Sequence, residues 1–322
     1  MILSRSATLG ILGWVLFATV SASSQVQGGG VTLSGGVSIS GGVTLSGSGS
    51  PSSATWSDTA RRVTLAVGVK TKDEFGVELF QTGGVAVLIA DKDNHPFIAT
   101  ALHVFSNPKE NWLPESLQIR GWKDEQTSRY VDFGSPIVLK KDGKQLYTAS
   151  DAFDLAIIPA TKEIIERLKG GDNLVFAIHP GDLGDRAATY DGEDVFILGF
   201  PALVGEQYQQ RALMRSGIIA WTDPSGPAEH EFLIDARIFR GNSGGPVFSS
   251  PAGTNRDAGI STSKPVKLLG LVSQTINAKP DVAFGVNLPD KAMVIGAAGV
   301  GVIEPSQELL RLMAKAEQTG TQ

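Results

Sequence analysis

One serine in the chain lies in a setting that suits nucleophilic chemistry. Ser243 stands in the run Gly-Asn-Ser-Gly-Gly-Pro, from Gly241 to Pro246. A serine hydroxyl is a weak nucleophile at its ordinary pKa, so it needs a nearby base and a backbone that leaves its oxygen accessible. The surrounding glycines permit a tight turn in which the amide hydrogens of Gly241 and Ser243 converge on one point. We therefore expect these two amides to form an oxyanion hole.

Two further polar residues border apolar segments. His103 directly follows the run Ile-Ala-Thr-Ala-Leu at 98–102, and Asp154 precedes Leu-Ala-Ile-Ile at 155–158. A side chain at the end of a strand can project from a rigid position into a cleft. Asp151 is a competing acid, but its neighbours predict a turn. The chain therefore carries a histidine, an aspartate and a serine in that order.

The elements that must position these residues are mostly strands. From about residue 60 onward, short runs rich in Val, Ile, Leu and Phe alternate with Gly, Pro, Asp and Asn, and this pattern predicts an all-β sandwich or barrel. The expected strands are 63–69, 84–90, 97–101, 155–159, 195–200, 216–221, 232–234, 268–272 and 283–288. The exceptions are a helical turn at 161–168 and a terminal amphipathic helix with Pro305 in its first turn. Its apolar face is Leu309, Leu312, Met313 and Ala316.

The motifs resemble those of the trypsin-like (chymotrypsin-fold) serine peptidases. Within that family, the sequence pattern is most similar to the bacterial HtrA and glutamyl-endopeptidase branches. Thr-Ala-Leu-His, ending at His103, is similar to the family's Thr-Ala-x-His, and the Asp-Leu-Ala that begins at Asp154 to its Asp-Leu-Ala. The run 241–246 is similar to its Gly-(Asp/Asn)-Ser-Gly-Gly-Pro. Weaker similarities lie at 82–84, 199–201, 216–218 and 283–286. The resemblance covers roughly residues 60 to 300.

The resemblance implies an all-β fold of two perpendicular six-stranded β-barrels, with a C-terminal α-helix. The active site would lie between the barrels, with His103 and Asp154 on the first and Ser243 on the second. It implies a serine endopeptidase that cleaves polypeptides through an acyl-enzyme. His103 would take the serine proton and return it to the leaving amine, while Asp154 fixes the histidine tautomer.

Two features depart from the digestive members of the family. Asn242 replaces the aspartate that precedes the serine, and no Ile-Val-Gly-Gly activation sequence is present. We therefore expect no activation by a newly formed N-terminus. A PDZ domain, as in HtrA proteins, is not expected after residue 300.

The resemblance also suggests residues that contact substrate. Arg237 would lie near the floor of the primary pocket and Arg240 near its mouth, while Val272, Ser273 and Gln274 would form the strand that pairs with the substrate backbone. Two cations there would favour an acidic side chain. The alternative to this preference is that both arginine side chains lie along the protein surface and do not recognise substrate.

A different class of function is a catalytically silent trypsin-like scaffold that acts as a protein-binding module. The intact set of histidine, aspartate and serine favours an enzyme over that alternative. Ester hydrolysis by the same residues is a weaker third hypothesis.

The amino-acid composition excludes several classes of function and of binding site. With 42% hydrophobic residues, the chain of 322 residues can bury a hydrophobic core. Its net charge of −5 provides no positive electrostatic potential that would attract the phosphates of a nucleic acid. The absence of cysteine excludes disulfides, thiolate metal sites and a cysteine nucleophile. No two of the four histidines have the close spacing of a metal pair. We therefore expect no cofactor, no metal and no nucleic-acid partner.

The N-terminal region differs from the rest of the chain. Arg5, the apolar run 7–20 and small residues after it predict a signal peptide at 1–22, export to the periplasm or medium of a bacterium, and no stable membrane insertion. An uncleaved anchor is the alternative. Residues 23–58 form a Gly/Ser-rich linker that contains three hexads, GGVTLS, GGVSIS and GGVTLS. A short β-solenoid is disfavoured because three repeats lack a cap.

The remaining expected boundaries follow the strands. They are 59–180 for the N-terminal barrel with the inter-barrel connection, 181–303 for the C-terminal barrel, and 304–322 for the C-terminal helix and tail.

Overall fold

The computed structural model describes most of the chain after residue 55. The described residues are 42–43, 56–122, 130–132, 136–168, 175–201, 211–223, 230–239, 241–255, 259–261, 265–276 and 299–320. The expected signal peptide, most of the hexad linker, Arg240 and the expected strand at 283–288 lie outside these residues.

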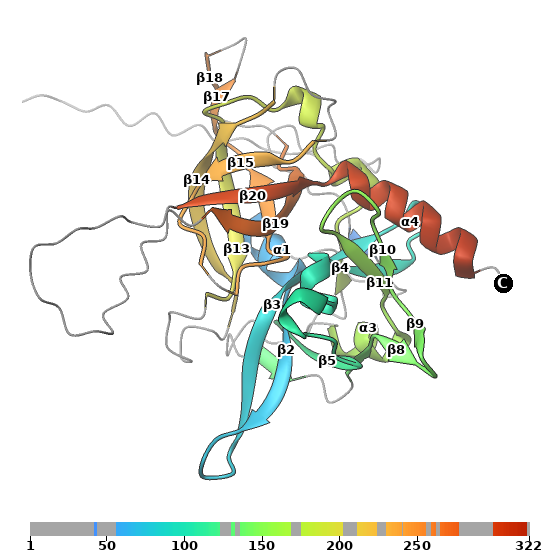
Figure 1. The fold of residues 1–322 in the computed structure, drawn as a ribbon. Helices are drawn as coiled ribbons and strands as arrows, with labels where there is room; N and C mark the ends of the chain where they lie inside the picture. The colour runs from blue at the N-terminus through green and yellow to red at the C-terminus, as the bar shows by residue number, and fades with distance from the viewer. Residues whose placement is uncertain are drawn as a thin grey trace, which may run out of the picture. The chain divides into compact units, whose positions relative to one another are not determined.

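The first half of the described chain is built around one antiparallel sheet. Its elements are α1 (Trp56–Val63), β2 (Thr64–Lys72), β3 (Glu78–Ala90), β4 (Pro96–Thr100), α2 (Leu102–Phe105), η1 (Pro108–Glu110), β5 (Ser116–Trp122), β6 (Tyr130–Asp132), β7 (Ile137–Val138), β8 (Lys140–Lys141), β9 (Lys144–Gln145), β10 (Thr148–Ala149), β11 (Ala156–Pro159) and α3 (Lys162–Leu168). The strand order is β10-β11-β4-β3-β2-β5-β6, with β7 pairing with β5. Beyond the sheet, β2 and β3 continue as a two-stranded ribbon (Figure 1).

The second half contains a closed barrel. Its elements are η2 (Pro180–Asp182), η3 (Arg186–Ala188), β13 (Asp194–Gly199), β14 (Leu213–Trp221), β15 (Phe232–Asp235), β16 (Pro246–Ser249), β17 (Gly253–Asn255), β18 (Gly259–Ser261), β19 (Leu268–Ile276), β20 (Val300–Pro305) and α4 (Gln307–Gly320). The barrel order is β13-β14-β15-β20-β19-β16, and every pair is antiparallel. Short two-stranded pairs form between β1 (Gly42–Val43) and β12 (Val175–Phe176), between β8 and β9, and between β17 and β18.

The two faces of β3 enter different cores, because side chains alternate along a strand. Ala86 and Leu88 pack into a core made of residues between 65 and 177, without residues of the closed barrel. Val85 and Val87 pack into a second core that also contains barrel residues, among them Phe248. The buried stretch of β3 therefore lies between the sheet's own core and the barrel.

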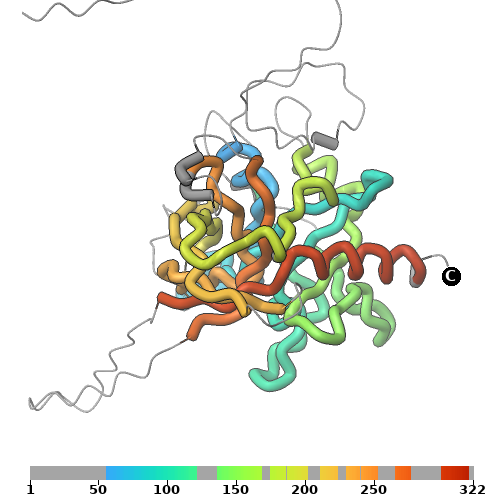
Figure 2. The backbone as a smooth tube through the Cα atoms, turned by 90° about the horizontal axis from the view of Figure 1, so that it is seen from above, coloured from blue at the N-terminus to red at the C-terminus, as the bar shows by residue number. Residues whose placement is uncertain are grey.

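Helix α4 completes the second core. Leu309, Leu312 and Met313 on one helix face are buried in it, as the helical spacing predicts. The helix contacts β10, β11 and β20, so it spans from the barrel to the first sheet (Figures 1 and 2). No helix in the described part of the chain is both long and apolar enough to cross a membrane.

The expected fold class is confirmed, with three differences in detail. Within the described residues the first sheet has eight strands and does not close as the second barrel does. The strand that closes the second barrel is β20 at Val300–Pro305, a segment not among the expected strands. Pro305 ends this strand instead of starting the helix, since proline at a strand end need not donate to the ladder.

Candidate active site

Antiparallel pairing of β4 with β11 brings His103 and Asp154 together. Thr100, the last residue of β4, pairs with Ala156, the first residue of β11. His103 lies three residues beyond Thr100 in the single turn of α2, and Asp154 lies two residues before Ala156. The backbone N–H of Leu102 donates to the Asp154 carbonyl at 3.1 Å, which fixes the two segments against each other.

The Asp154 carboxylate accepts three hydrogen bonds. Its Oδ2 lies 2.6 Å from His103 Nδ1 and 2.8 Å from the Ser273 hydroxyl, which donates to it. Its Oδ1 accepts the backbone N–H of His103 at 3.0 Å. A carboxylate can only accept, so the hydrogen of the imidazole lies on Nδ1. Nε2 is then the basic nitrogen, and it has no hydrogen-bond partner among the described residues.

The loop that carries Ser243 is held by strands from both halves of the chain. The Gly244 N–H donates to the Val272 carbonyl of β19 at 2.7 Å. The Val85 N–H of β3 donates to the Ser243 carbonyl at 2.7 Å. Gly244 has φ +81°, and a Cβ there would lie 2.0 Å from the Val85 carbonyl oxygen. This position therefore requires glycine on two grounds, conformation and space.

The same loop lies next to the segment that carries His103. A Cβ on Gly84 would lie 2.6 Å from Val104 Cγ2 and 3.0 Å from the Ser243 carbonyl oxygen, so Val104 and Ser243 both contact the bare face of this glycine. A Cβ on Gly244 would lie 3.1 Å from the Ala101 backbone nitrogen. The serine and the histidine are thus on adjoining segments. No hydrogen bond joins Ser243 Oγ to His103 in the described structure, a common finding before substrate tightens such contacts.

Within the described part of the chain, neither amide expected to form the oxyanion hole donates to another backbone group. Gly241 has φ +92°, a left-handed conformation that suits glycine. Asn242 donates its N–H to the Phe239 carbonyl at 3.1 Å, and Gly245 donates to the Asn242 carbonyl at 2.8 Å. The N–H groups of Gly241 and Ser243 make no such bond within the described residues.

Asn242 fills the space behind the serine loop. Its side chain is fully buried, and neither amide atom has a hydrogen-bond partner within the described residues. It contacts Gly199, where a Cβ would lie 2.6 Å from Asn242 Oδ1. A neutral amide costs less to bury unpaired than a carboxylate, so this position needs no cation to balance it.

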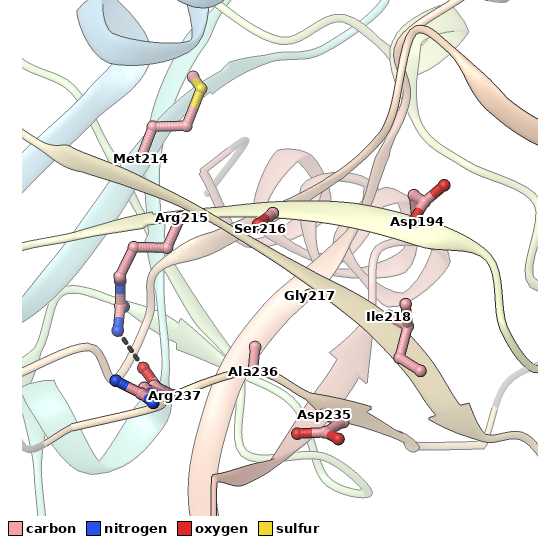
Figure 3. A pocket seen from close by; sticks show the side chains of 9 residues that line it. All are labelled: Asp194, Met214, Arg215, Ser216, Gly217, Ile218, Asp235, Ala236 and Arg237. Carbon is pink, nitrogen blue, oxygen red and sulfur yellow. Dashed lines mark hydrogen bonds between the residues drawn. The ribbon is translucent and has the colours of Figure 1, made fainter.

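The residues expected to contact substrate have different surroundings. Arg237 is exposed and lines an open pocket with a volume of about 640 Å³ (Figure 3). The pocket is lined by Asp194, Met214, Arg215, Ser216, Gly217, Ile218, Asp235, Ala236 and Arg237. Arg215 donates from Nη1 to the Arg237 carbonyl, and burial lowers the pKa of Arg215. Two of its other nitrogens, Nε and Nη2, have no partner within the described residues.

The three residues on β19 are arranged in sequence along the strand. The backbone of Val272 binds the serine loop at both its N–H and its carbonyl, and the Ser273 side chain binds Asp154. Both residues are buried, whereas Gln274 is exposed. The contact of this strand with substrate stays a prediction.

The competing polar residues have other partners. Asp151 is 94% exposed in its side chain and pairs with Lys315 of α4 at 2.9 Å. His95 pairs with Asp91 at 2.8 Å within one turn. In the described part of the chain, no group of three or more His, Asp or Glu residues is arranged to hold a metal ion.

Sequence reasoning missed one acid at this site. Glu304 on β20 is only 3% exposed, and its Oε2 has no hydrogen-bond partner within the described residues. Burial raises the pKa of Glu304 to about 7. The available signal is a lone acid inside the apolar run Val-Gly-Val-Ile-Glu-Pro at 300–305.

A closed antiparallel barrel packed on a second β-sheet, with a glycine-flanked serine beside a histidine and aspartate pair, defines the class of trypsin-like serine peptidases. The family model of the trypsin-like peptidase domain matches residues 84–254. The chain belongs to this family.

Solved structures that are similar to the chain include two of an HtrA-type protease. The HtrA-type protease AlgW with a tripeptide is 17% identical and has a TM-score of 0.44, with 81% of this chain and 64% of that chain covered. A serine-to-alanine variant of AlgW, also with a tripeptide, is 17% identical and has a TM-score of 0.43, with 80% and 60% covered. The chain thus spans less than two thirds of the length of either structure. None of the curated proteins compared matches the chain.

Proposed function

We propose that the chain is a serine endopeptidase that hydrolyses peptide bonds of a polypeptide through an acyl-enzyme on Ser243. The observation that carries the proposal is the hydrogen bond from His103 Nδ1 to Asp154, which leaves Nε2 as a free base on the segment next to the Ser243 loop. The N–H groups of Gly241 and Ser243, which make no backbone hydrogen bond within the described residues, support it further.

In the proposed first half-reaction, Ser243 Oγ attacks the carbonyl carbon of the peptide while His103 Nε2 takes the hydroxyl proton. The imidazolium that forms is stabilised through Nδ1 by the Asp154 carboxylate. The negative charge on the carbonyl oxygen is stabilised by the N–H groups of Gly241 and Ser243. The C–N bond then breaks, His103 protonates the leaving amine, and an ester to Ser243 remains.

In the second half-reaction, water takes the place of the amine. His103 Nε2 takes a proton from the water as the water attacks the ester. The negative charge again forms on the carbonyl oxygen, where the N–H groups of Gly241 and Ser243 stabilise it. The C–O bond breaks, and Ser243 regains its proton from His103. The proposed site needs no activation by a new N-terminus, because the buried Asn242 is neutral.

We also propose export of the protein, on the strength of the apolar run at 7–20 and the small residues after it. The mature protein recovered from bacterial periplasm or medium should begin near residue 23, which N-terminal sequencing measures. A protein that retains residue 1 would contradict the proposed cleavage.

A preference for acidic substrate side chains is the finer part of the proposal. Arg237 is exposed, and the guanidinium of Arg215 lies against its backbone. Asp194 and Asp235 line the same pocket and oppose this preference. Fluorogenic peptides that differ only in Glu, Asp or Leu before the cleaved bond test it. Faster cleavage after Glu or Asp, reduced in Arg237→Ala, is expected, whereas equal or faster cleavage after Leu would exclude it.

The test of the proposed activity compares two serine variants. Hydrolysis of a fluorescent casein should be lost in Ser243→Ala and kept in Ser116→Ala, because Ser116 is an exposed serine of β5, a strand that carries none of the proposed catalytic residues. His103→Ala should lose activity as Ser243→Ala does. Full activity in folded Ser243→Ala would exclude this mechanism and favour a binding scaffold or a contaminating peptidase.

A further inference from the structure

The turn that carries Asp154 is organised by one serine. The Ser150 hydroxyl oxygen accepts the backbone N–H groups of Ala152 at 3.2 Å and Phe153 at 3.1 Å. The backbone N–H of Ser150 donates to the Leu155 carbonyl at 2.9 Å. These bonds involve residues on both sides of Asp154 in the sequence, so the path of the backbone at Asp154 depends on Ser150.

The same serine is bound by helix α4, which lies far away in the sequence. The Ser150 hydroxyl donates to Glu308 Oε1 at 2.6 Å, across 158 positions. Both residues are buried, and Glu308 Oε2 accepts a hydrogen bond from Arg311 at 3.3 Å. The helix contacts β10 and β11, the strands that precede and follow the turn (Figures 1 and 2). A buried hydrogen bond therefore joins α4 to the turn that carries Asp154.

Other contacts of α4 with this region are of a different kind. Leu312 packs in the apolar core that the helix shares with both halves of the chain, and such packing has no preferred direction. Lys315 pairs with Asp151 at 2.9 Å, but both side chains are exposed, and exposed ion pairs contribute little. The bond between Ser150 and Glu308 is both buried and directional, so it can fix the orientation of the turn.

We propose that Ser150 and Glu308 are positioning residues for Asp154, and that α4 acts on the site through them. Their hydrogen bond fixes the turn so that the Asp154 carboxylate lies 2.6 Å from His103 Nδ1. Without this bond the Ser150 hydroxyl can rotate away from the two backbone N–H groups that it accepts. Asp154 then no longer keeps one orientation toward the ring. This inference rests on the proposed function, in which Asp154 and His103 activate Ser243.

Steady-state hydrolysis of a peptide by the full chain tests the hydrogen bond itself. Ser150→Ala and Glu308→Ala remove it, whereas Glu308→Gln keeps it, because the Gln carbonyl oxygen can still accept the hydroxyl. In the two alanine variants we expect kcat to fall about 10- to 10²-fold with little change in KM, since a small misplacement of a catalytic group is costly. Glu308→Gln should stay near the wild type. The double variant of Ser150→Ala and Glu308→Ala should lose no more than the larger single loss, because both act through one bond.

Leu312→Ala is the matched control on the same helix. It removes buried apolar contacts of α4 but neither partner of the hydrogen bond. Rates are compared at a temperature at which circular dichroism shows each variant to be folded. Leu312→Ala should then keep a kcat near that of the wild type despite its lower stability. An equal fall of kcat in Leu312→Ala and Ser150→Ala, or in Glu308→Gln and Glu308→Ala, would overturn the proposal.

A proton NMR signal separates this proposal from the proposed function, because it needs no catalysis. The hydrogen on His103 Nδ1, bound to Asp154, gives a low-field signal that is identified by its loss in His103→Ala. At one fixed pH, this signal should move or broaden in Ser150→Ala and Glu308→Ala and stay in place in Glu308→Gln.

An unchanged signal in the folded alanine variants overturns the positioning role, whether or not the wild type is active. A changed signal together with an inactive wild type supports the positioning role and contradicts the proposed function. Either alanine variant decides the question if the other fails to fold.

Discussion

At the residue scale, Asp154 is the most heavily bonded member of the site. It accepts from His103 twice and from Ser273 once. Asp154→Asn presents an amide N–H toward the ring, which favours the tautomer with hydrogen on Nε2. We expect kcat to fall about 10⁴-fold with little change in KM, as in other such triads.

The control for that prediction is Asp151→Asn, because Asp151 is exposed and paired with Lys315. Steady-state kinetics on a peptide substrate measure both variants. Equal losses in the two variants, or a small loss in Asp154→Asn, would contradict the assigned role of Asp154.

The buried Glu304 carboxyl makes stability depend on pH. A group whose pKa is higher in the folded than in the unfolded state stabilises the fold most below the unfolded value, and that stability is lost as the pH rises through the folded value. For Glu304 the window runs from 4.5 to about 7. A change of this size corresponds to a destabilisation of about 3 kcal/mol at high pH, as an order of magnitude.

Glu304→Gln removes this titration. In urea unfolding, the variant and the wild type should have similar stability at pH 5, and the variant should be the more stable at pH 8. A difference in stability that does not change with pH would show that Glu304 does not titrate in this window.

The sequence alone predicted roles for His103, Asp154 and Ser243 because each stands in a local motif, the first two beside apolar runs and the third among glycines. It did not predict the place of Glu304, because that depends on strand pairing over long separations. Ser273 reaches Asp154 across 119 positions, and Glu304 lies opposite Leu271 in the pairing of β19 with β20. Such contacts have no local signal.

At the element scale, glycines allow the serine loop to approach the first sheet. Gly244→Ala places a Cβ 2.0 Å from the Val85 carbonyl oxygen, so the loop must move. Gly143→Ala is the matched control, because Gly143 has a similar φ of +75° in the β8 to β9 turn but nothing within 4 Å of its Cβ position.

Both substitutions incur the backbone cost of about 1–2 kcal/mol for a left-handed alanine. Only Gly244→Ala adds the clash, so it should lose more stability in urea unfolding and nearly all peptidase activity. Equal stability and activity in the two variants would contradict the packing described for this loop.

Strand placement near the C-terminus illustrates the limit of pattern reasoning. Both 283–288 and 300–305 are apolar runs, and one strand was expected at the first. The structure uses the second as β20, where Ile303 pairs with Phe232 on one side and Val272 on the other. The first run lies outside the described residues. Recognising the second run as a strand requires its partners on both sides, which the sequence does not give.

At the scale of the whole molecule, the site depends on the packing of the barrel against the first sheet. The core shared by both halves includes Val87, Phe248 and Leu312 of α4. Leu312→Ala should lower the free energy of unfolding by about 2–5 kcal/mol, as expected for a buried leucine.

Leu310→Ala is the control on the same helix, because Leu310 is 39% exposed. Its effect should be about 0.5 kcal/mol or less, as for surface substitutions. Urea unfolding of both variants measures the difference. Equal effects would mean that α4 is not part of the shared core.

The central claim is that Ser243 is the nucleophile and that His103 activates it. Reaction with a fluorophosphonate, followed by peptide mapping in a mass spectrometer, tests this claim most directly. The account predicts one adduct, on Ser243, that forms in the wild type and is lost in His103→Ala. An adduct on another residue, or none in folded wild-type protein, would contradict it.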